Sequence, residues 1–329
     1  MSISISGSRV STMQSILKII QKLLDGRLPW RLSQAFAKYH VEFLRRYYDR
    51  VVDKTPPMIT GKDDLHFEIH LLLGSRHVGM CLWAVKSLLD AAGKKYAVVL
   101  HDDGSLSDKD IEKLERHLIG VRVFRKPDAD RLIAERIAGF PHVEMYRFNQ
   151  LGKTEWGRRM SIFSLKLLDF NLLTNARKVL VLDTDVLFFK RPDLIVTWIE
   201  DVDSGDSLYC HEYYQPILNA NRNVIGFERK KEIPIGFNSG LICLDHDALN
   251  LSVFELWLEK NRERVDRVYT FEQHAYNHLV DCSNRHGALP ESYSFNYNDT
   301  NCIATHFGIK LFFFNNLERV RRALARKLP

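Results

Sequence analysis

The chain has 329 residues, of which 45% are hydrophobic, so it can bury one large α/β core with appendages. Its formal net charge is only +6, and no nucleic-acid-binding motif accompanies that charge, so we expect no nucleic-acid partner. No apolar run reaches the length of about eighteen residues that a membrane-spanning helix needs, and none is predicted.

Five dispersed cysteines and a Ser-rich start argue for a cytoplasmic protein. Residues 1–15 lack the continuous apolar core of a signal peptide. The cysteines show no paired spacing typical of a zinc site, and an odd, scattered set is typical of reduced thiols. These residues are Cys81, Cys210, Cys243, Cys282 and Cys302.

Residues 1–62 are predicted to form a helical N-terminal extension. Ile and Leu residues recur at helical spacing over positions 16–24. A second helix is predicted from Leu32 to Val52, a segment that contains both aromatic residues and arginines. Thr55-Pro56-Pro57 ends that helix.

Residues 63–312 are predicted to form the main α/β domain, which begins with a βαβ unit. A strand over Phe67–Leu73, a helix and a strand over Tyr96–Leu100 follow one another. Ser107 and Asp110 predict a capping box at the start of the next helix. Right-handed crossovers would place the carboxyl ends of the strands at one edge, where nucleotides bind in open α/β sheets.

Two acids follow the second strand of this unit, in the segment His101-Asp102-Asp103-Gly104-Ser105. Either Asp102 or Asp103 is positioned to accept a hydrogen bond from a nucleoside. The alternative, in which both side chains only shape the turn and cap the strand, is equally open at this stage.

The apolar segment Lys178–Leu182 runs directly into Asp183-Thr184-Asp185. The segment has the composition of a strand buried on both faces. Thr184 turns the chain so that both carboxylates can face one ion. Carboxylate oxygens suit a hard divalent cation such as Mn²⁺ or Mg²⁺, which keeps positions open for substrate phosphates.

Two downstream segments bring polar side chains to strand and helix ends. Phe237–Leu244 is predicted as a turn followed by an apolar strand, with Asn238 and Gly240 at a strand edge where a ligand can approach the backbone. Glu272 and Gln273 open an amphipathic helix, so a carboxylate and an amide lie at its positive end.

The segment Ile303–Lys310 is predicted as a strand followed by a loop. His306 can complete a metal shell, and Lys310 can pair with a phosphate. Gly308 separates the two side chains and supplies backbone flexibility.

These motifs, taken in order over residues 66–310, resemble the metal-dependent glycosyltransferases of the type-A fold (GT-A). The order of motifs is most similar to family eight, which includes glycogenin and bacterial galactosyl and glucosyl transferases. The resemblance implies a Rossmann-like α/β fold with a mostly parallel sheet. It also implies transfer of a sugar from a nucleotide-sugar donor, UDP-linked in most such enzymes, to a hydroxyl acceptor with retention of configuration.

The resemblance also implies residue roles. Asp183, Asp185 and His306 would be the metal ligands, and Lys310 would bind the diphosphate. Asn238 and Gln273 would lie beside the donor sugar, with Lys166 contacting the sugar or phosphate. An inverting reaction would need a carboxylate base near the acceptor hydroxyl, for which Glu272 is the only motif-linked candidate. Thr184, Gly240, Gly308, Asp102 and Asp103 would line the donor site. The chain departs from the family pattern in two places: Glu272 replaces the usual Asp, and His306 and Lys310 lie closer together than usual.

Two other functions stay open on the residues alone. A haloacid-dehalogenase-type phosphatase also has Asp-x-Asp after an apolar strand. Its signature, however, has Thr or Val at the position of Leu187. Its acidic pair also follows the Asp-x-Asp motif, whereas Asp102-Asp103 precedes it. The other alternative is a catalytically inactive nucleotide-sugar-binding scaffold, against which the retention of both acids and His306 argues.

Residues 313–329 are predicted to form a basic amphipathic C-terminal helix with several arginines. Basic ends can lie on an anionic membrane surface, which would suit a lipid-linked acceptor on the inner face of a membrane. They can equally pack on the main domain or mediate a homodimer. The acceptor itself, whether carbohydrate, lipid-linked sugar or protein, is not indicated by any motif.

Overall fold

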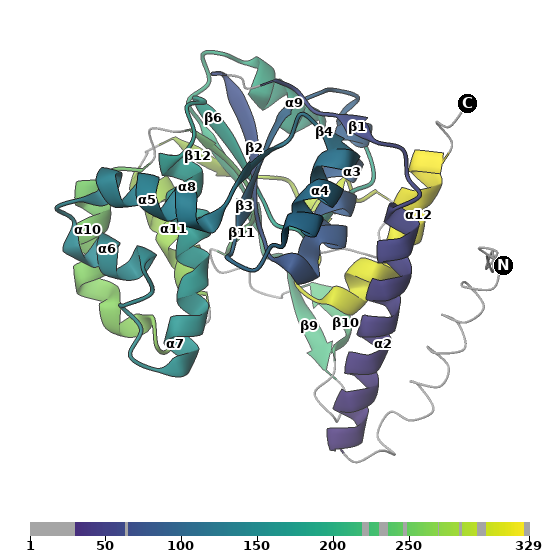
Figure 1. Ribbon diagram of the computed structural model, residues 1–329, viewed down its shortest axis with the longest axis horizontal. Coiled ribbons are helices and arrows are strands. Elements are labelled where there is room, and N and C mark those ends of the chain that lie inside the picture. The colour runs from purple at the N-terminus through teal and green to yellow at the C-terminus, as the bar shows by residue number, and fades with distance from the viewer. Residues whose placement is uncertain are drawn as a thin grey trace.

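The computed structural model shows an α/β fold in which a mostly parallel sheet lies between two layers of helices (Figure 1). It confirms the α/β class and the mostly parallel sheet expected from the sequence. The structure describes residues 30–62, 65–218, 224–229, 236–245, 249–268, 270–282, 285–294 and 301–325. The apolar repeat over positions 16–24 lies outside these residues.

The central sheet has seven strands in the spatial order β12-β8-β11-β6-β2-β3-β5. β6, β2, β3 and β5 are parallel neighbours, and β12 is parallel to β8. β11 is antiparallel to both β6 and β8. The bounds are β2 (Phe67–Leu73), β3 (Ala97–Asp102), β5 (Arg122–Phe124), β6 (Lys178–Leu182), β8 (Ser207–His211), β11 (Phe237–Asp245) and β12 (His286–Ala288).

Three two-stranded sheets complete the strand set of the described residues. The pair that matters for the site is β7 with β13, which are antiparallel. The bounds are β7 (Val186–Phe188), β13 (Ala304–His306), β9 (Tyr214–Leu218), β10 (Val224–Arg229), β1 (Met58–Ile59) and β4 (Leu118–Ile119).

Helices cover both faces of the sheet (Figure 1). On one side lie α2 (Trp30–Val52), α3 (Val78–Ala92), α4 (Asp108–His117), α9 (Asp193–Glu200) and α12 (Lys310–Ala325). On the other side lie α5 (Lys126–Ile137), α6 (Pro141–Arg147), α8 (Ser164–Leu172), α10 (Leu251–Asn261) and α11 (Phe271–Cys282), with the short α7 (Glu155–Met160) leading into α8.

The central strands divide their side chains between two apolar clusters. Leu180 and Leu182 of β6 pack with the α3 side, whereas Val179 and Val181 pack with the α11 side. Successive side chains of a strand point to opposite faces, so a strand covered on both faces is mostly apolar. β6 is fully buried, and its one charged residue, Lys178, donates a hydrogen bond to the Trp198 carbonyl.

Most sequence-predicted elements form with nearly the expected bounds. β2 spans Phe67–Leu73 as predicted, and Ser107 with Asp110 makes the predicted capping box at the start of α4. β11 differs, because the segment read as a turn followed by a strand is one strand of nine residues. Its pairing with β8 shifts register between Asn238 and Ile242, and this irregularity accommodates the turn-like residues without ending the strand.

The terminal helices pack on the sheet's helical layer rather than standing apart. α2 and α12 contact each other and both contact α3. α12 begins at Lys310, before the expected position 313, and buries Phe313, Phe314 and Leu317 against the core. The predicted basic residues at positions 326 and 327 lie outside the described residues.

All five cysteines are free thiols, and only Cys282 is exposed. Among the described residues, no helix combines the length and the apolar character needed to cross a membrane.

Candidate metal and donor site

The site is built where β6 ends and where a second strand returns to the same point. Asp183 follows the last residue of β6, and Asp185 precedes β7. β13 pairs with β7 so that His306 lies opposite Val186, directly beside Asp185. Hydrogen bonds from the Asp183 amide to the Gly240 carbonyl (2.9 Å) and from the Phe307 amide to the Asp185 carbonyl (3.0 Å) hold this loop in place.

Asp183, Asp185 and His306 form a cluster with the geometry of a metal shell. One ligand atom from each lies within 4.8 Å of the others. The Nε2 atom of His306 is 3.2 Å from Oδ1 of Asp185 and 3.5 Å from Oδ2 of Asp183. Neighbouring ligands of an octahedral ion with bonds of about 2.1 Å lie about 3 Å apart, so the three residues fit Mn²⁺ or Mg²⁺. Thr184 is half-buried in the turn between the acids.

The two charges at the centre of the cluster stabilise each other. Burial lowers the pKa of His306, but the neighbouring Asp185 more than offsets this and leaves that pKa above its usual value. Burial likewise raises the pKa of Asp185, and His306 brings it below its usual value. The side chains therefore form an ion pair in the absence of a metal, and a bound cation would take the place of the imidazole proton.

Asn238 and Gly240, from β11, complete the surroundings of His306. The Asn238 Oδ1 atom lies 2.8 Å from Nδ1 of His306 and accepts a hydrogen bond of 2.9 Å from the Gly240 amide. Gly240 was expected to let a ligand approach the backbone. In the structure its missing side chain leaves room for the imidazole, because a Cβ atom there would overlap the His306 ring.

Lys166 is a buried cation that binds one member of the cluster. Its Nζ atom lies 2.7 Å from Oδ1 of Asp183 and 3.4 Å from Oε1 of Glu272, and donates to the Ser239 carbonyl at 2.7 Å. Burial alone would lower the pKa of Lys166, but Asp183 and Glu272 raise it above its usual value. The lysine therefore stays charged and neutralises part of the acidic cluster.

Glu272 lies in the first turn of α11, as predicted, and is buried against this lysine. Its Oε2 atom accepts a hydrogen bond of 2.9 Å from Ser239. Burial raises the pKa of Glu272 above its usual value, although Lys166 opposes the shift. Gln273 follows it in the same turn and is half-buried.

Lys310 lies at the first position of α12 rather than in the loop expected from the sequence. Its Nζ atom is 2.7 Å from Nε2 of His77, the residue before α3. Burial lowers the pKa of Lys310, and the nearby Asp185 opposes that shift. Gly308 has φ +51°, a left-handed conformation that favours glycine, and it sets the turn between β13 and α12.

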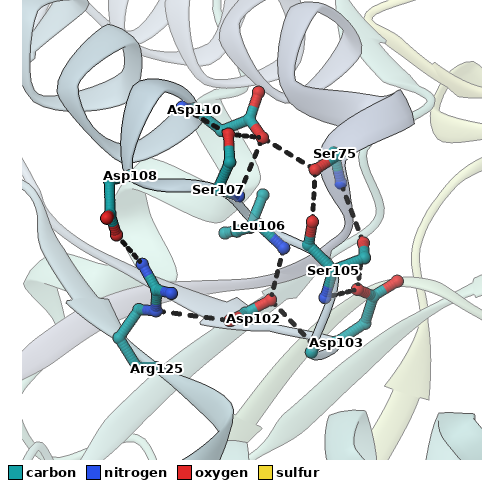
Figure 2. Close-up of polar contacts among 10 residues, drawn as sticks. Ser75, Asp102, Asp103, Ser105, Leu106, Ser107, Asp108, Asp110 and Arg125 are labelled. Atoms are coloured by element: carbon teal, nitrogen blue, oxygen red, sulfur yellow. Dashed lines mark hydrogen bonds and ion pairs between the residues drawn. The ribbon is translucent and has the colours of Figure 1, made fainter.

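Asp102 and Asp103 shape the loop after β3 (Figure 2). Oδ1 of Asp102 accepts hydrogen bonds from the amides of Gly104 (2.8 Å) and Leu106 (3.0 Å), and Oδ2 lies 3.6 Å from Arg125. Oδ1 of Asp103 accepts from the amide and hydroxyl of Ser105. The turn-shaping role is therefore present in the structure for both acids, whereas Oδ2 of Asp102 is paired with Arg125.

Sequence reasoning missed three residues of this region. Ser239 lies inside a motif that was noticed, but its hydroxyl contact with Glu272 follows from the fold of α11 onto β11. Glu212, whose Oε1 atom lies 3.3 Å from Nδ2 of Asn238, follows β8 and carries no local signal. His77 is near Lys310 only because α3 and α12 start at neighbouring points.

Comparison with known proteins gives structural neighbours only. No family model matches the chain, and no curated protein matches it. Mouse xyloside xylosyltransferase 1 is similar at 13% identity and a TM-score of 0.47, over 76% of this chain and 97% of that protein. The galactosyltransferase LgtC, solved with donor and acceptor sugar analogues, is similar at 16% identity and a TM-score of 0.49, over 80% and 97%.

A third neighbour is core-mannan synthase A from Aspergillus fumigatus in an Mn/GDP form, at 10% identity and a TM-score of 0.40, over 72% of this chain and 77% of that protein. The first two neighbours are glycosyltransferases by name, and the third is named a synthase. Similarity at this level does not assign an activity, so the proposal below is argued from the residues of the site.

Proposed function

We propose that this protein is a divalent-metal-dependent glycosyltransferase that moves a sugar from a nucleotide-sugar donor, UDP-linked, to a hydroxyl acceptor. The observation that carries the proposal is the convergence of Asp183, Asp185 and His306 on one point at the carboxyl end of β6. These residues come from chain segments more than a hundred positions apart, and together they offer the oxygen and nitrogen donors that Mn²⁺ accepts.

The ion would supply Lewis-acid stabilisation of the charge that develops on the β-phosphate when the sugar leaves. The neighbouring charged groups would favour binding of the ion. Asp183 and Glu272 lie against one buried cation, Lys166, and Asp185 lies against the imidazole of His306. A divalent ion would restore the balance of charge. We propose that Lys310, whose ammonium lies near Asp185, binds the diphosphate.

A retaining reaction is supported by the surroundings of Glu272. An inverting transferase needs a carboxylate base that is free to take the proton of the acceptor hydroxyl. The side chain of Glu272, the only motif-linked candidate, is 11% exposed; its Oε2 accepts a hydrogen bond from Ser239, and its Oε1 lies 3.4 Å from the ammonium of Lys166. We therefore assign Glu272 to the support of the site. We propose that Gln273 lies on the donor-sugar side, whereas Asn238 contacts His306.

The phosphatase alternative is not favoured. A nucleophilic carboxylate must be free to attack phosphorus, whereas Oδ1 of Asp183 is paired with Lys166 and Oδ2 faces His306.

For the partners, we propose a carbohydrate, lipid-linked or protein acceptor. The cytoplasmic location, the membrane contact of the basic helices and a homodimer remain proposals of the same kind.

Thermal stability in the presence of UDP and nucleotide sugars, with and without Mn²⁺, tests the proposal. A ligand at 100 times its Kd stabilises the native state by about 2.7 kcal/mol, which raises Tm measurably. We expect a rise with UDP that requires Mn²⁺ and is lost in Asp185→Ala but kept in Asp203→Ala, an exposed acid outside the site. Release of UDP from the donor should follow the same pattern. A rise without metal, or none with any nucleotide, would contradict the proposal.

A further inference from the structure

We propose that Asn238 is a positioning residue that fixes His306 in the tautomer able to bind a metal, and that Gly240 provides both a hydrogen bond and the space for this arrangement. The inference rests on the proposed function, because it takes the cluster of Asp183, Asp185 and His306 to be a metal site. It gives Asn238 a different role from the donor-sugar contact that the sequence suggested.

The side-chain amide of Asn238 has neighbours that determine its orientation. On one side lies the Gly240 amide, a donor, so the atom of Asn238 at 2.9 Å from it must be the oxygen. On the other side lies Oε1 of Glu212 at 3.3 Å, a carboxylate oxygen that accepts, so the atom facing it must be the NH₂ group. A flipped amide would place oxygen against oxygen and N–H against N–H. The two neighbours therefore select one orientation.

This orientation decides which nitrogen of His306 carries hydrogen. Nδ1 lies 2.8 Å from Oδ1 of Asn238, and an acceptor on one side of a hydrogen bond requires a donor on the other. Nδ1 must therefore be protonated. In the neutral ring the lone pair is then on Nε2, the atom that lies 3.2 Å and 3.5 Å from the two carboxylates. Metal-ligating histidines are commonly oriented by such a bond from their other nitrogen.

The irregular geometry of β11 allows Asn238 and Gly240 to contact His306. Pairing with β8 shifts register between Asn238 and Ile242, so the strand is irregular where Asn238 and Gly240 meet His306. A Cβ atom at Gly240 would overlap Nδ1, Cγ and Cε1 of the His306 ring. A larger residue would push the imidazole away from Asp183 and Asp185. The Asn-x-Gly spacing thus supplies an acceptor for Nδ1 and room for the ring.

Mn²⁺ affinity in the absence of nucleotide, measured by electron paramagnetic resonance, tests the inference. Asn238→Leu keeps the approximate size of the side chain but removes the acceptor, and we expect it to weaken Mn²⁺ binding by about 10- to 100-fold. The double variant Asn238→Asp, Glu212→Gln keeps an acceptor for Nδ1 and gives the new carboxylate a donor. We expect it to restore most of the affinity.

Wild-type affinity in Asn238→Leu, or an equal loss in the double variant, would overturn the inference. If circular dichroism shows that Asn238→Leu is unfolded, Asn238→Ala replaces it and is judged by the same criterion. Wild-type protein that binds Mn²⁺ but turns over no nucleotide sugar would overturn the proposed function and leave this inference standing. Wild-type protein that binds no Mn²⁺ would overturn both the inference and the proposed function. Where Mn²⁺ binds, ¹⁵N shifts of the neutral metal-free His306 ring report the tautomer, and hydrogen on Nε2 would overturn the inference alone.

Discussion

The ammonium group of Lys166 lies 2.7 Å from Oδ1 of Asp183, with only 3% of the lysine side chain exposed. A second carboxylate, Glu272, lies 3.4 Å from the same nitrogen. The resemblance to known transferases implied that this lysine contacts the donor. In the structure it connects α8 to the metal-ligand candidate and to α11, so its first role is to hold carboxylates together.

Replacing this lysine should therefore destabilise the protein. Breaking a buried ion pair by removing one partner costs about 3 to 5 kcal/mol, so we expect Lys166→Met to lower the free energy of unfolding by about 3 kcal/mol. Removing a second charge in Lys166→Met, Glu272→Gln should recover part of the loss. Urea unfolding measures both.

A matched control is Lys94→Met, which removes an exposed pair with Glu200. Exposed pairs contribute about 0 to 1 kcal/mol, so this variant should unfold close to the wild type. Equal effects at Lys166 and Lys94 would show that the buried pair is not structural.

We expect substitutions of the two acids after β3 to have different effects, because Asp102 supports the loop and Asp103 is proposed to bind the nucleotide. In Asp102→Ala, the amides of Gly104 and Leu106 lose their acceptor, and an unsatisfied buried donor costs about 1 to 3 kcal/mol. We expect a clear loss of Tm in this variant.

Asp103→Ala should instead weaken UDP binding, by about tenfold for one lost hydrogen bond of about 1.4 kcal/mol, with a smaller change in Tm. Its Oδ1 accepts hydrogen bonds from Ser105 at the loop surface. Calorimetric titration with UDP and Mn²⁺ measures the binding. Unchanged UDP affinity in Asp103→Ala would remove this residue from the donor site.

Stability should also fall in mild acid, and buried His117 is one contributor to this fall. Nδ1 of His117 lies 3.2 Å from Nζ of Lys86, and the His117 side chain is 3% exposed. Burial lowers the pKa of His117 to about 4, and the charge of Lys86 adds to the shift. The unfolded chain, with an ordinary histidine pKa near 6.5, therefore binds a proton that the folded protein does not.

The stabilising effect of this neutral histidine is fully present above about pH 6.5 and is lost as pH falls toward 4. One proton changes the free energy of unfolding by about 1.4 kcal/mol per pH unit in this window. We expect His117→Gln to flatten the dependence, as measured by urea unfolding from pH 4 to 7. A wild-type slope in His117→Gln would contradict the assignment.

Local patterns predicted the elements well, because their causes are local. The apolar run of β6 and the capping box of Ser107 and Asp110 depend on neighbouring residues, and both appear as predicted. The turn expected at Asn238–Gly240 did not form, because pairing with β6 and β8 outweighs the turn preference of Asn and Gly.

The candidate metal ligands could be identified from the sequence, but the residues that contact and position them could not. Asp183, Asp185 and His306 carry recognisable chemistry. The pairing of β13 with β7 that brings them together joins segments that are far apart in the sequence. Glu212 illustrates the limit most clearly. It is an ordinary acid in the sequence, and only the antiparallel place of β11 beside β8 sets it against Asn238.

The central claim is that one cation is bound between Asp183, Asp185 and His306. Anomalous diffraction at the manganese edge, from crystals grown with Mn²⁺ and UDP, tests it most directly. The account predicts a peak with bonds of about 2.1 Å to one carboxylate oxygen of each acid and to Nε2 of His306. A peak elsewhere, or an ordered nucleotide with no peak beside these three side chains, would contradict it.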